Sequence, residues 1–245
     1  RHMKTIRLLA IASLLAVSAA CHKAEPQETA FGSLQVSMEI SEQTKAFTEE
    51  ELCNSAIVNI YKKDFSGLVR SYPYTQMPSP FYLAVGEYRV DVLAGESVMK
   101  EPSVASWENK SYKGSAEFSI LENQTQSVEV VAYVDNAVTA ITLDQTVAAN
   151  FQPGYSLKIG VDPENAASQL TYTADKSGAE GYFIVSGLIE PSFSWTFSGN
   201  LAKDGSAFEK SGKIEGIEAG KLYKMNLKYT IKDGDLSISL VVDES

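Results

Sequence analysis

Few side chains in this sequence could act as nucleophiles or bases. Its only histidines are His2 and His22, and its only cysteines are Cys21 and Cys53. A nucleophilic cysteine or serine needs an activating base, and both histidines precede the first segment that is patterned as a strand. Cys53 lies beside an apolar run and is predicted to be a small buried residue. The sequence therefore predicts no histidine-assisted catalysis.

Carboxylates are abundant but do not form a recognisable site. Acidic clusters occur in "TEEEL" at 48–52 and "KDGD" at 232–235, where spacing alone assigns neither a general acid nor a base. "VDPEN" at 161–165 and "KDGD" are typical of turns. The sequence contains no phosphate-binding glycine loop, HExxH motif, CxxC pair or EF-hand loop. We therefore expect no enzymatic activity, no metal site and no cofactor.

Cys21 follows a segment that is typical of export. Residues 1–2 precede the first methionine and are typical of a cloning remnant. Basic residues at 4 and 7 are then followed by an apolar segment at 8–17 and small residues at 18–20. This order is that of a signal peptide, and about ten apolar residues are too few to span a bilayer as a helix. An ordinary secretory signal, with Cys21 present by chance, is the alternative.

Small residues directly before a cysteine resemble a bacterial lipobox, which implies that Cys21 is lipidated and begins the mature protein. Ser18 stands where that pattern usually has an apolar residue. The polar, proline-containing segment 21–32 suits a tether, and two or more acyl chains would hold it at a membrane. Cys53 then has no cysteine partner. The net charge of -10, without a basic stripe, argues against nucleic-acid binding.

Short alternating segments recur along the rest of the chain, separated by Gly, Pro, Asn and Asp. A first set of strands is expected within residues 34–134, and it begins with "LQVSMEI" at 34–40. A second set is expected within 137–243, with one short helix at 145–151. Frequent turns between short strands are typical of β-sandwiches. Because about fifteen strands exceed one compact sandwich, we predict an all-β chain of two tandem Greek-key sandwiches.

The predicted organisation has four parts. Residues 1–20 are a cloning remnant and signal peptide, 21–32 a lipidated tether, 33–135 an N-terminal β-sandwich and 136–245 a C-terminal β-sandwich. The last boundary lies where a strand ends and Asp135-Asn136 can turn. Since almost no linker separates the two sandwiches, we expect a semi-rigid rod.

One internal hairpin carries a family resemblance. In "FYLAVGEYRVDVLAG" at 81–95, an apolar strand is followed by Gly86, Tyr88 and alternating valines. This order resembles the hairpin of transthyretin-like and carboxypeptidase-regulatory-like β-sandwiches, in which the tyrosine re-enters the core. Together with the lipobox, residues 33–47, residues 115–144 and a second sandwich, it makes the chain resemble the fimbrillin-like, type V pilus-associated lipoproteins of the Bacteroidales.

The resemblance implies an outer-membrane lipoprotein that is processed by a trypsin-like protease. In polymerising subunits the protease cuts after a basic residue that follows the first strand, and another subunit inserts a donor strand into the groove left behind. Here the first strand would be 34–40, and the nearest basic residue after it is Lys45. The family protease is often arginine-directed, and the alternative is that Lys45 is a solvated loop charge.

The C-terminal segment "DGDLSISLVVDES" contains a candidate donor strand. Four apolar residues alternate with small or polar ones, namely Leu236, Ile238, Leu240 and Val242. Left uncovered, such a strand would favour aggregation. The alternative is that it forms the last edge strand of the second sandwich, paired with 221–230.

Aromatic residues in two loop segments suggest a second kind of function. "VRSYPYTQMPSPFY" at 69–82 and "SWENKSY" at 106–112 supply four candidate glycan contacts, namely Tyr72, Tyr74, Trp107 and Tyr112. Exposed rings held by prolines could stack on sugars with little loss of entropy. The alternative is that these rings cap the cores.

Taken together, these features predict a structural or adhesive cell-surface lipoprotein, as a fimbrial subunit or accessory protein; surface glycan binding is the alternative. The expected location is the outer membrane through a lipid anchor, or a fimbria after processing. The expected partners are other fimbrial subunits or surface ligands, with membrane contact only through the anchor and no nucleic acid.

Overall fold

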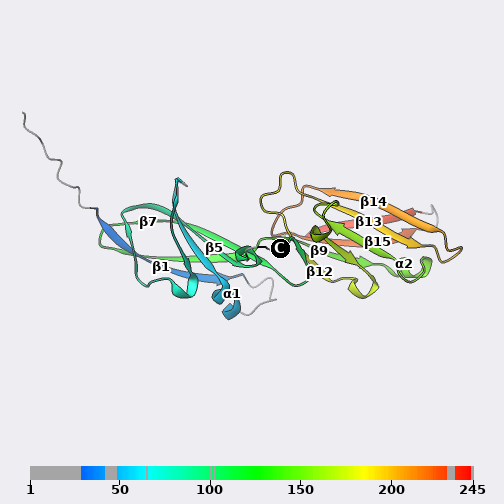
Figure 1. Cartoon of the computed structure of the whole chain (residues 1–245), viewed down its shortest axis with the longest axis horizontal. Helices are drawn as coiled ribbons and strands as arrows, with labels where there is room; N and C mark the ends of the chain where they lie inside the picture. Colours follow the sequence, from blue (N-terminus) through cyan, green and yellow to red (C-terminus); the bar gives the residue numbers. More distant parts are fainter. Residues whose placement is uncertain are drawn as a thin grey trace, which may run out of the picture.

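A computed structural model shows an elongated molecule with two β-rich lobes placed end to end (Figure 1). It describes residues 29–41, 49–64, 66–99, 101, 103–230 and, for the backbone alone, 235–243. We call β1–β5, β7 and β8 the N-terminal lobe, and β6 and β9–β16 the C-terminal lobe. Within the described ranges, no helix has the length and apolar character needed to cross a bilayer.

The N-terminal lobe contains seven strands and a short helix, α1. The helix spans Glu49–Ser55, and the strands are β1 (Phe31–Ile40), β2 (Ile57–Lys62), β3 (Leu68–Pro73), β4 (Phe81–Ala84), β5 (Gly86–Gly95), β7 (Ser111–Ile120) and β8 (Thr125–Val134). Single 3-10 turns at Tyr74–Gln76 and Glu96–Val98 follow β3 and β5. The set of strands predicted within residues 34–134 is therefore present.

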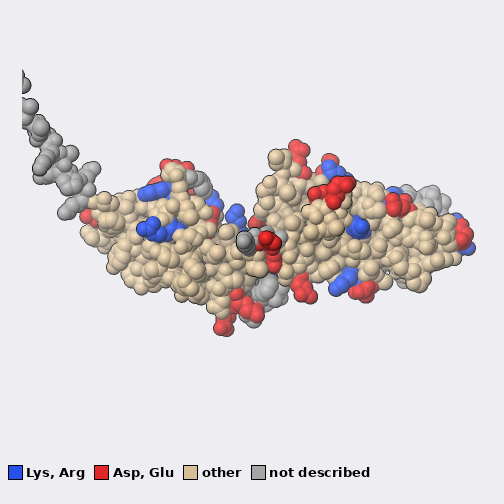
Figure 2. All heavy atoms as spheres, viewed as in Figure 1, with Lys and Arg blue, Asp and Glu red and all other residues tan. Residues whose placement is uncertain are grey.

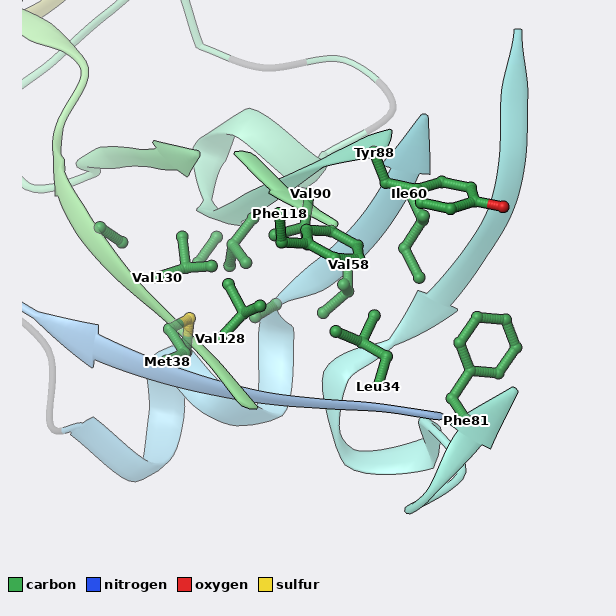
Figure 3. Close-up of a cluster of buried hydrophobic side chains, with 14 of the residues drawn as sticks. Leu34, Met38, Val58, Ile60, Phe81, Tyr88, Val90, Phe118, Val128 and Val130 are labelled. Carbon is green, nitrogen blue, oxygen red and sulfur yellow. The ribbon is translucent and has the colours of Figure 1, made fainter. Parts of the chain in front are cut away.

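The seven strands form one sheet in the order β3-β2-β5-β7-β8-β1-β4. The hairpin β7–β8 is paired only near Tyr112 and Val134, which lets the sheet fold over and enclose side chains from both of its halves. Leu34 on β1 and Val130 on β8 are fully buried in the same cluster as Val58 and Val90 on the other half. Figure 3 shows these side chains gathered between the strands.

The 81–95 hairpin has the arrangement expected from the resemblance. Tyr88 is buried and stacks on Phe118, with ring centroids 5.7 Å apart. Its hydroxyl donates to the carbonyl of Ala84 at 2.8 Å, and the ammonium group of Lys62 donates to it at 3.2 Å. The phenol thereby buries its ring while its polar end is hydrogen-bonded.

The C-terminal lobe is a sandwich of two separate sheets. Its strands are β6 (Ala105–Ser106), β9 (Asn136–Leu143), β10 (Ser156–Gly160), β11 (Gln169–Tyr172), β12 (Glu180–Ile184), β13 (Ser192–Asn200), β14 (Ala207–Glu215), β15 (Leu222–Thr230) and β16 (Asp235–Asp243). Helix α2 spans Gln145–Asn150, and 3-10 turns lie at Ala166–Ser168 and Ala174–Lys176.

One sheet has the order β11-β10-β13-β14 and the other β16-β15-β9-β12-β6. Between them lies a second buried cluster rich in aromatic rings, including Phe183, Phe193 and Phe197. Phe151, which follows α2, makes edge contacts with Phe197 at 4.9 Å and Tyr229 at 5.1 Å. The short helix predicted at 145–151 is confirmed, and Asp144 caps it by accepting from the Thr146 amide at 2.9 Å.

The lobes are joined by more than the chain connection at residue 135. The loop between β5 and β7 sends β6 across to pair with β12, and the Ile184 amide donates to the Val104 carbonyl at 2.9 Å. Next to β6, the Trp107 ring meets Tyr172 edge-on at 4.8 Å. The Asn136 side-chain oxygen accepts from the Ser111 amide at 2.7 Å in a buried position. These contacts connect elements of both lobes.

The prediction of an all-β sandwich fold is confirmed. The first strand begins earlier than predicted, at Phe31, so it includes two residues assigned to the tether. Gly32 permits this start because a Cβ there would lie 2.3 Å from the Leu121 carbonyl oxygen. A glycine in sequence suggests a turn, whereas here it allows close approach of two backbones.

Candidate functional site

The first strand is an integral part of the N-terminal lobe. β1 pairs in parallel with β8, from Ser33 opposite Thr125 to Ile40 opposite Ala132, and its first residues pair antiparallel with β4. Leu34 is 0% exposed and Met38 is also buried. Removal of β1 would therefore open a slot with backbone partners on both sides and an apolar floor.

The residues that would process and anchor the chain lie outside the described residues. Lys45 falls within 42–48, the segment between β1 and α1, and Cys21 precedes residue 29. Lipidation of Cys21 and cleavage after Lys45 therefore stay predictions.

The candidate donor strand is paired within the same chain. β16 runs antiparallel to β15 along its whole length, from Asp235 opposite Thr230 to Asp243 opposite Leu222, and it lies at the edge of its sheet. This is the edge-strand arrangement that was the alternative to a free donor strand. The side chains of Leu236, Ile238, Leu240 and Val242 are outside the described part of the structure.

Strand direction decides where each of these two strands begins. β15 pairs in parallel with β9 from Leu222 opposite Val138 to Leu227 opposite Leu143, so β15 ends and β16 begins at the α2 end of the C-terminal lobe (Figure 1). β1 begins at the opposite, outer end of the N-terminal lobe (Figure 1). The two strands thus start at the two far ends of the molecule.

The four aromatic residues proposed as glycan contacts are not gathered at one surface. Tyr72 and Tyr74 are half-buried against the N-terminal core, where Tyr72 meets Phe81 edge-on at 5.5 Å and the Tyr74 hydroxyl accepts from the Met38 amide at 3.4 Å. Trp107 is at the lobe junction. Tyr112 is 1% exposed, which corrects its assignment as a ligand contact because a ring buried in the core offers no face to a sugar.

Cys53 is half-buried against the N-terminal core and forms no disulfide. Among the described residues, no group of three or more His, Cys, Asp or Glu side chains could hold a metal ion. Charges are also dispersed: on the face shown in Figure 2, Lys and Arg are interspersed with Asp and Glu.

A family model described as "Domain of unknown function (DUF4493)" matches residues 30–245. The chain belongs to this family. The DUF4493 match begins one residue before β1 and continues past β16, so the family unit includes both lobes and both terminal strands.

Several solved structures are similar to this DUF4493 chain. A "putative cell adhesion protein" from Bacteroides eggerthii has a TM-score of 0.48 at 8% identity, covering 89% of this chain and 96% of that one. A "fimbrial assembly protein" from Parabacteroides distasonis has a TM-score of 0.44 at 12% identity, covering 86% and 99%. A "putative adhesin" from Bacteroides thetaiotaomicron has a TM-score of 0.40 at 9% identity, covering 90% and 98%. No curated protein sequence matches the chain.

The lobe junction contains a charged residue that sequence reasoning missed. Lys110 is 4% exposed, and its ammonium nitrogen lies 4.9 Å from the centroid of the Tyr182 ring. Burial lowers the pKa of Lys110, while the nearby Glu180 carboxylate acts in the opposite direction. The Tyr182 hydroxyl donates to Glu180 at 2.5 Å, and burial raises the pKa of Tyr182. This cluster packs elements of the two lobes together, and no sequence motif marks it.

Proposed function

We propose that this DUF4493 protein is a structural and adhesive lipoprotein of the cell surface, anchored through Cys21 and acting as a fimbrial subunit or accessory protein. Its assembly proceeds by donor-strand exchange: cleavage after Lys45 releases β1, and β16 of another copy leaves β15 and enters the vacated slot. The role requires no catalytic group. Its partners are other fimbrial subunits, and its location is the outer membrane or, after processing, the fimbria.

The observation that carries this proposal is the placement and direction of the two terminal strands. β16 is attached at the α2 end of the C-terminal lobe, and β1 begins at the outer end of the N-terminal lobe. When two copies stack head to tail, these ends meet. A released β16 then enters the slot in the same direction as β1, parallel to β8.

The energetics favour replacement of β1 over an empty slot. Loss of β1 would remove Leu34 and Met38 from the core, and each fully buried side chain of this size contributes about 1.5–3 kcal/mol. It would also leave the facing edges of β8 and β4 without their backbone partner. The sequence of β16 repeats the period-two apolar pattern of β1, so it could restore both contributions.

Limited proteolysis tests the exchange. Trypsin treatment of the purified chain should cut after Lys45 and convert monomers into oligomers on size-exclusion chromatography with light scattering. Lys45→Gln should abolish both events, whereas the matched control Lys203→Gln, in an exposed turn, should abolish neither. A chain that is cut after Lys45 and stays monomeric would disprove strand exchange.

Acyl labelling tests the anchor separately. In the producing cell, Cys21→Ala should lose the fatty-acid label and leave the membrane fraction, while Cys53→Ala should keep both. If the Cys21→Ala protein stays labelled and membrane-bound, the anchor is not at Cys21.

A further inference from the structure

The outer face of the sheet β11-β10-β13-β14 carries polar side chains in register. Ser156, Ser198 and Glu209 lie opposite one another on three adjacent strands. The next row, two residues along, contains Thr171, Lys158, Thr196 and Ser211. Neighbouring side chains such as Leu157 and Phe197 are fully buried on the other face. Because side chains alternate between the two faces along each strand, these rows of polar side chains lie on one face, with a spacing of about 4.8 Å between strands.

Two hollows on this face share residues, and a third adjoins the second at the end of the sheet. One of about 270 Å³ is lined by Ser156, Lys158, Pro163, Gln169, Ser194, Thr196, Ser198 and Glu209. The second, of about 290 Å³, shares Ser198 and Glu209 and reaches Gly154. The third, of about 410 Å³, begins at Gly154 and includes Tyr155 and Asp175. The first two form a groove that is polar along the sheet, and the third continues past Gly154, around the end of β10, to the Tyr155 ring on the core side.

Several polar groups in this groove are available to a ligand. In the described part of the chain, the Ser156 and Ser198 hydroxyls, the Lys158 ammonium group and the Glu209 carboxylate have no hydrogen-bond or ion-pair partner. By contrast, the hydroxyl oxygens of Thr196 and Ser211 are hydrogen-bonded to each other at 2.8 Å, which holds these two side chains in place on the sheet face. The open groups are hydrated in the free protein, and a ligand can replace this water only by making equivalent hydrogen bonds.

We infer that this groove binds a neutral oligosaccharide. Sugar hydroxyls both donate and accept, so they match the mixed set of serine hydroxyls, one ammonium group and one carboxylate along the sheet. Past the end of β10, the Tyr155 ring is half-buried against Phe151 and Phe197, and in the adjoining hollow it offers an apolar edge with a polar tip. The inference rests on the adhesive role proposed above, to which it adds a ligand class and a site.

The charges of the groove argue against other ligands. The two carboxylates among the lining residues, Glu209 and Asp175, outnumber the single ammonium group of Lys158 and would repel a phosphate or sulfate group. The Thr173 hydroxyl donates to Asp175 and lowers the pKa of that carboxyl, which keeps it ionised. An extended peptide would bind a sheet edge, whereas these rows of polar side chains lie on a sheet face.

Affinity gel electrophoresis with four neutral glycans, namely dextran, mannan, xylan and galactomannan, tests the inference. At least one of these should retard the intact chain, and Ser198→Arg, which blocks the centre of the groove, should weaken retardation at least tenfold. Glu209→Gln should weaken it severalfold. Ser119→Arg, an exposed serine on β7 of the N-terminal lobe, is the matched control and should bind normally. An unchanged circular dichroism spectrum, which reports on both lobes, verifies that each variant is folded.

Three outcomes would overturn the inference: no retardation by any of the four glycans, retardation only by an acidic polysaccharide such as heparin, or equal loss in the Ser198→Arg and Ser119→Arg variants. None of them bears on cleavage after Lys45 or on oligomer formation, so failure of the glycan site is distinguishable from failure of strand exchange.

Discussion

The chain passes through the two lobes in the same order. In the N-terminal lobe, β1 pairs in parallel with β8 and antiparallel with β4, while β3-β2-β5-β7 follow one another across the other half. In the C-terminal lobe, β9 pairs in parallel with β15 and antiparallel with β12, while β11-β10-β13-β14 repeat the other half. A short helix follows the first strand in both. The lobes therefore share one topology despite their different core residues.

The differences lie at the first strand and at the sheet edges. β9 is joined to α2 through Asp144 alone, whereas residues 41–48 separate β1 from α1. The C-terminal lobe also has two additional strands, β16 beside β15 and β6 beside β12. The first strand is thus held by short connections in one lobe, whereas in the other it is joined to the next element by a longer segment that contains the proposed cleavage residue.

The largest expected effect is lobe-specific loss of stability. Leu34→Ala in β1 and Leu227→Ala in β15 each truncate a leucine that is 0% exposed, and each should lower the free energy of unfolding by about 2–5 kcal/mol. Both tryptophans, Trp107 and Trp195, pack against the C-terminal core. Urea unfolding followed by tryptophan fluorescence should therefore shift strongly for Leu227→Ala and little for Leu34→Ala.

The same pair tests whether the lobes are independent units. Circular dichroism, which reports on both lobes, should detect an early transition in Leu34→Ala that fluorescence does not. Coincident transitions by both probes in both variants would show instead that the two lobes unfold as one cooperative unit.

A smaller effect is expected at the junction, where β6 supplements the C-terminal sheet. Trp107→Ala removes two contacts of the indole ring: the edge contact with Tyr172, and the cation–π contact with the Lys176 ammonium group, which lies 5.3 Å from the ring centroid. Because Trp107 is half-buried, the loss should be about 2 kcal/mol, roughly half that for a fully buried tryptophan. Hydrogen exchange should accelerate at Ile184, whose amide bonds to Val104.

Hydrogen exchange of the backbone amides in β5 and in the paired end of β7 is the internal reference, and its rate should not change. If Ile184 stays as protected as in the unmodified chain, β6 is held by its backbone pairing and not by the tryptophan.

Local pattern predicted the strands well because each one alternates between a buried and an exposed face. The pairs Leu34 and Val36, or Met225 and Leu227, mark a core side whatever the topology. Pattern could not predict β6, which has two residues and is a strand only because β12 is beside it. It also missed α1, since residues 49–55 contain three consecutive glutamates and no helical apolar stripe.

The same limit applies to the sites. Tyr112 and Trp107 are equally aromatic in sequence, and only the fold buries one in a core and places the other at a junction. The row formed by Ser156, Ser198 and Glu209 brings together residues that three separate strands contribute. Each is an ordinary polar residue on an exposed strand face, so register between strands, which the sequence does not state, creates the groove.

The smallest expected effect concerns Asp144, which connects the first strand of the C-terminal lobe to its helix. Its carboxylate accepts the Thr146 amide, and this lowers the pKa of Asp144 below its ordinary value. A carboxyl with a lowered pKa in the folded state stabilises the fold above its unfolded pKa, and this contribution is lost as the pH falls through the folded pKa. Asp144→Ala should therefore lower the urea midpoint modestly at pH 7, and the difference from the unmodified chain should shrink as the medium is made acidic.

Asp144→Asn separates the cap from its charge, because asparagine also caps helices but does not titrate. Its urea midpoint at pH 7 should lie close to that of the unmodified chain, and its difference from Asp144→Ala should persist in acid. If Asp144→Ala and Asp144→Asn are equally destabilised at pH 7, the carboxylate acts through charge and not as a hydrogen-bonded cap. The short connection between β9 and α2 would then be stabilised by charge and not by a hydrogen-bonded cap. In that case the two lobes would differ, at the connection after their first strand, only in its length.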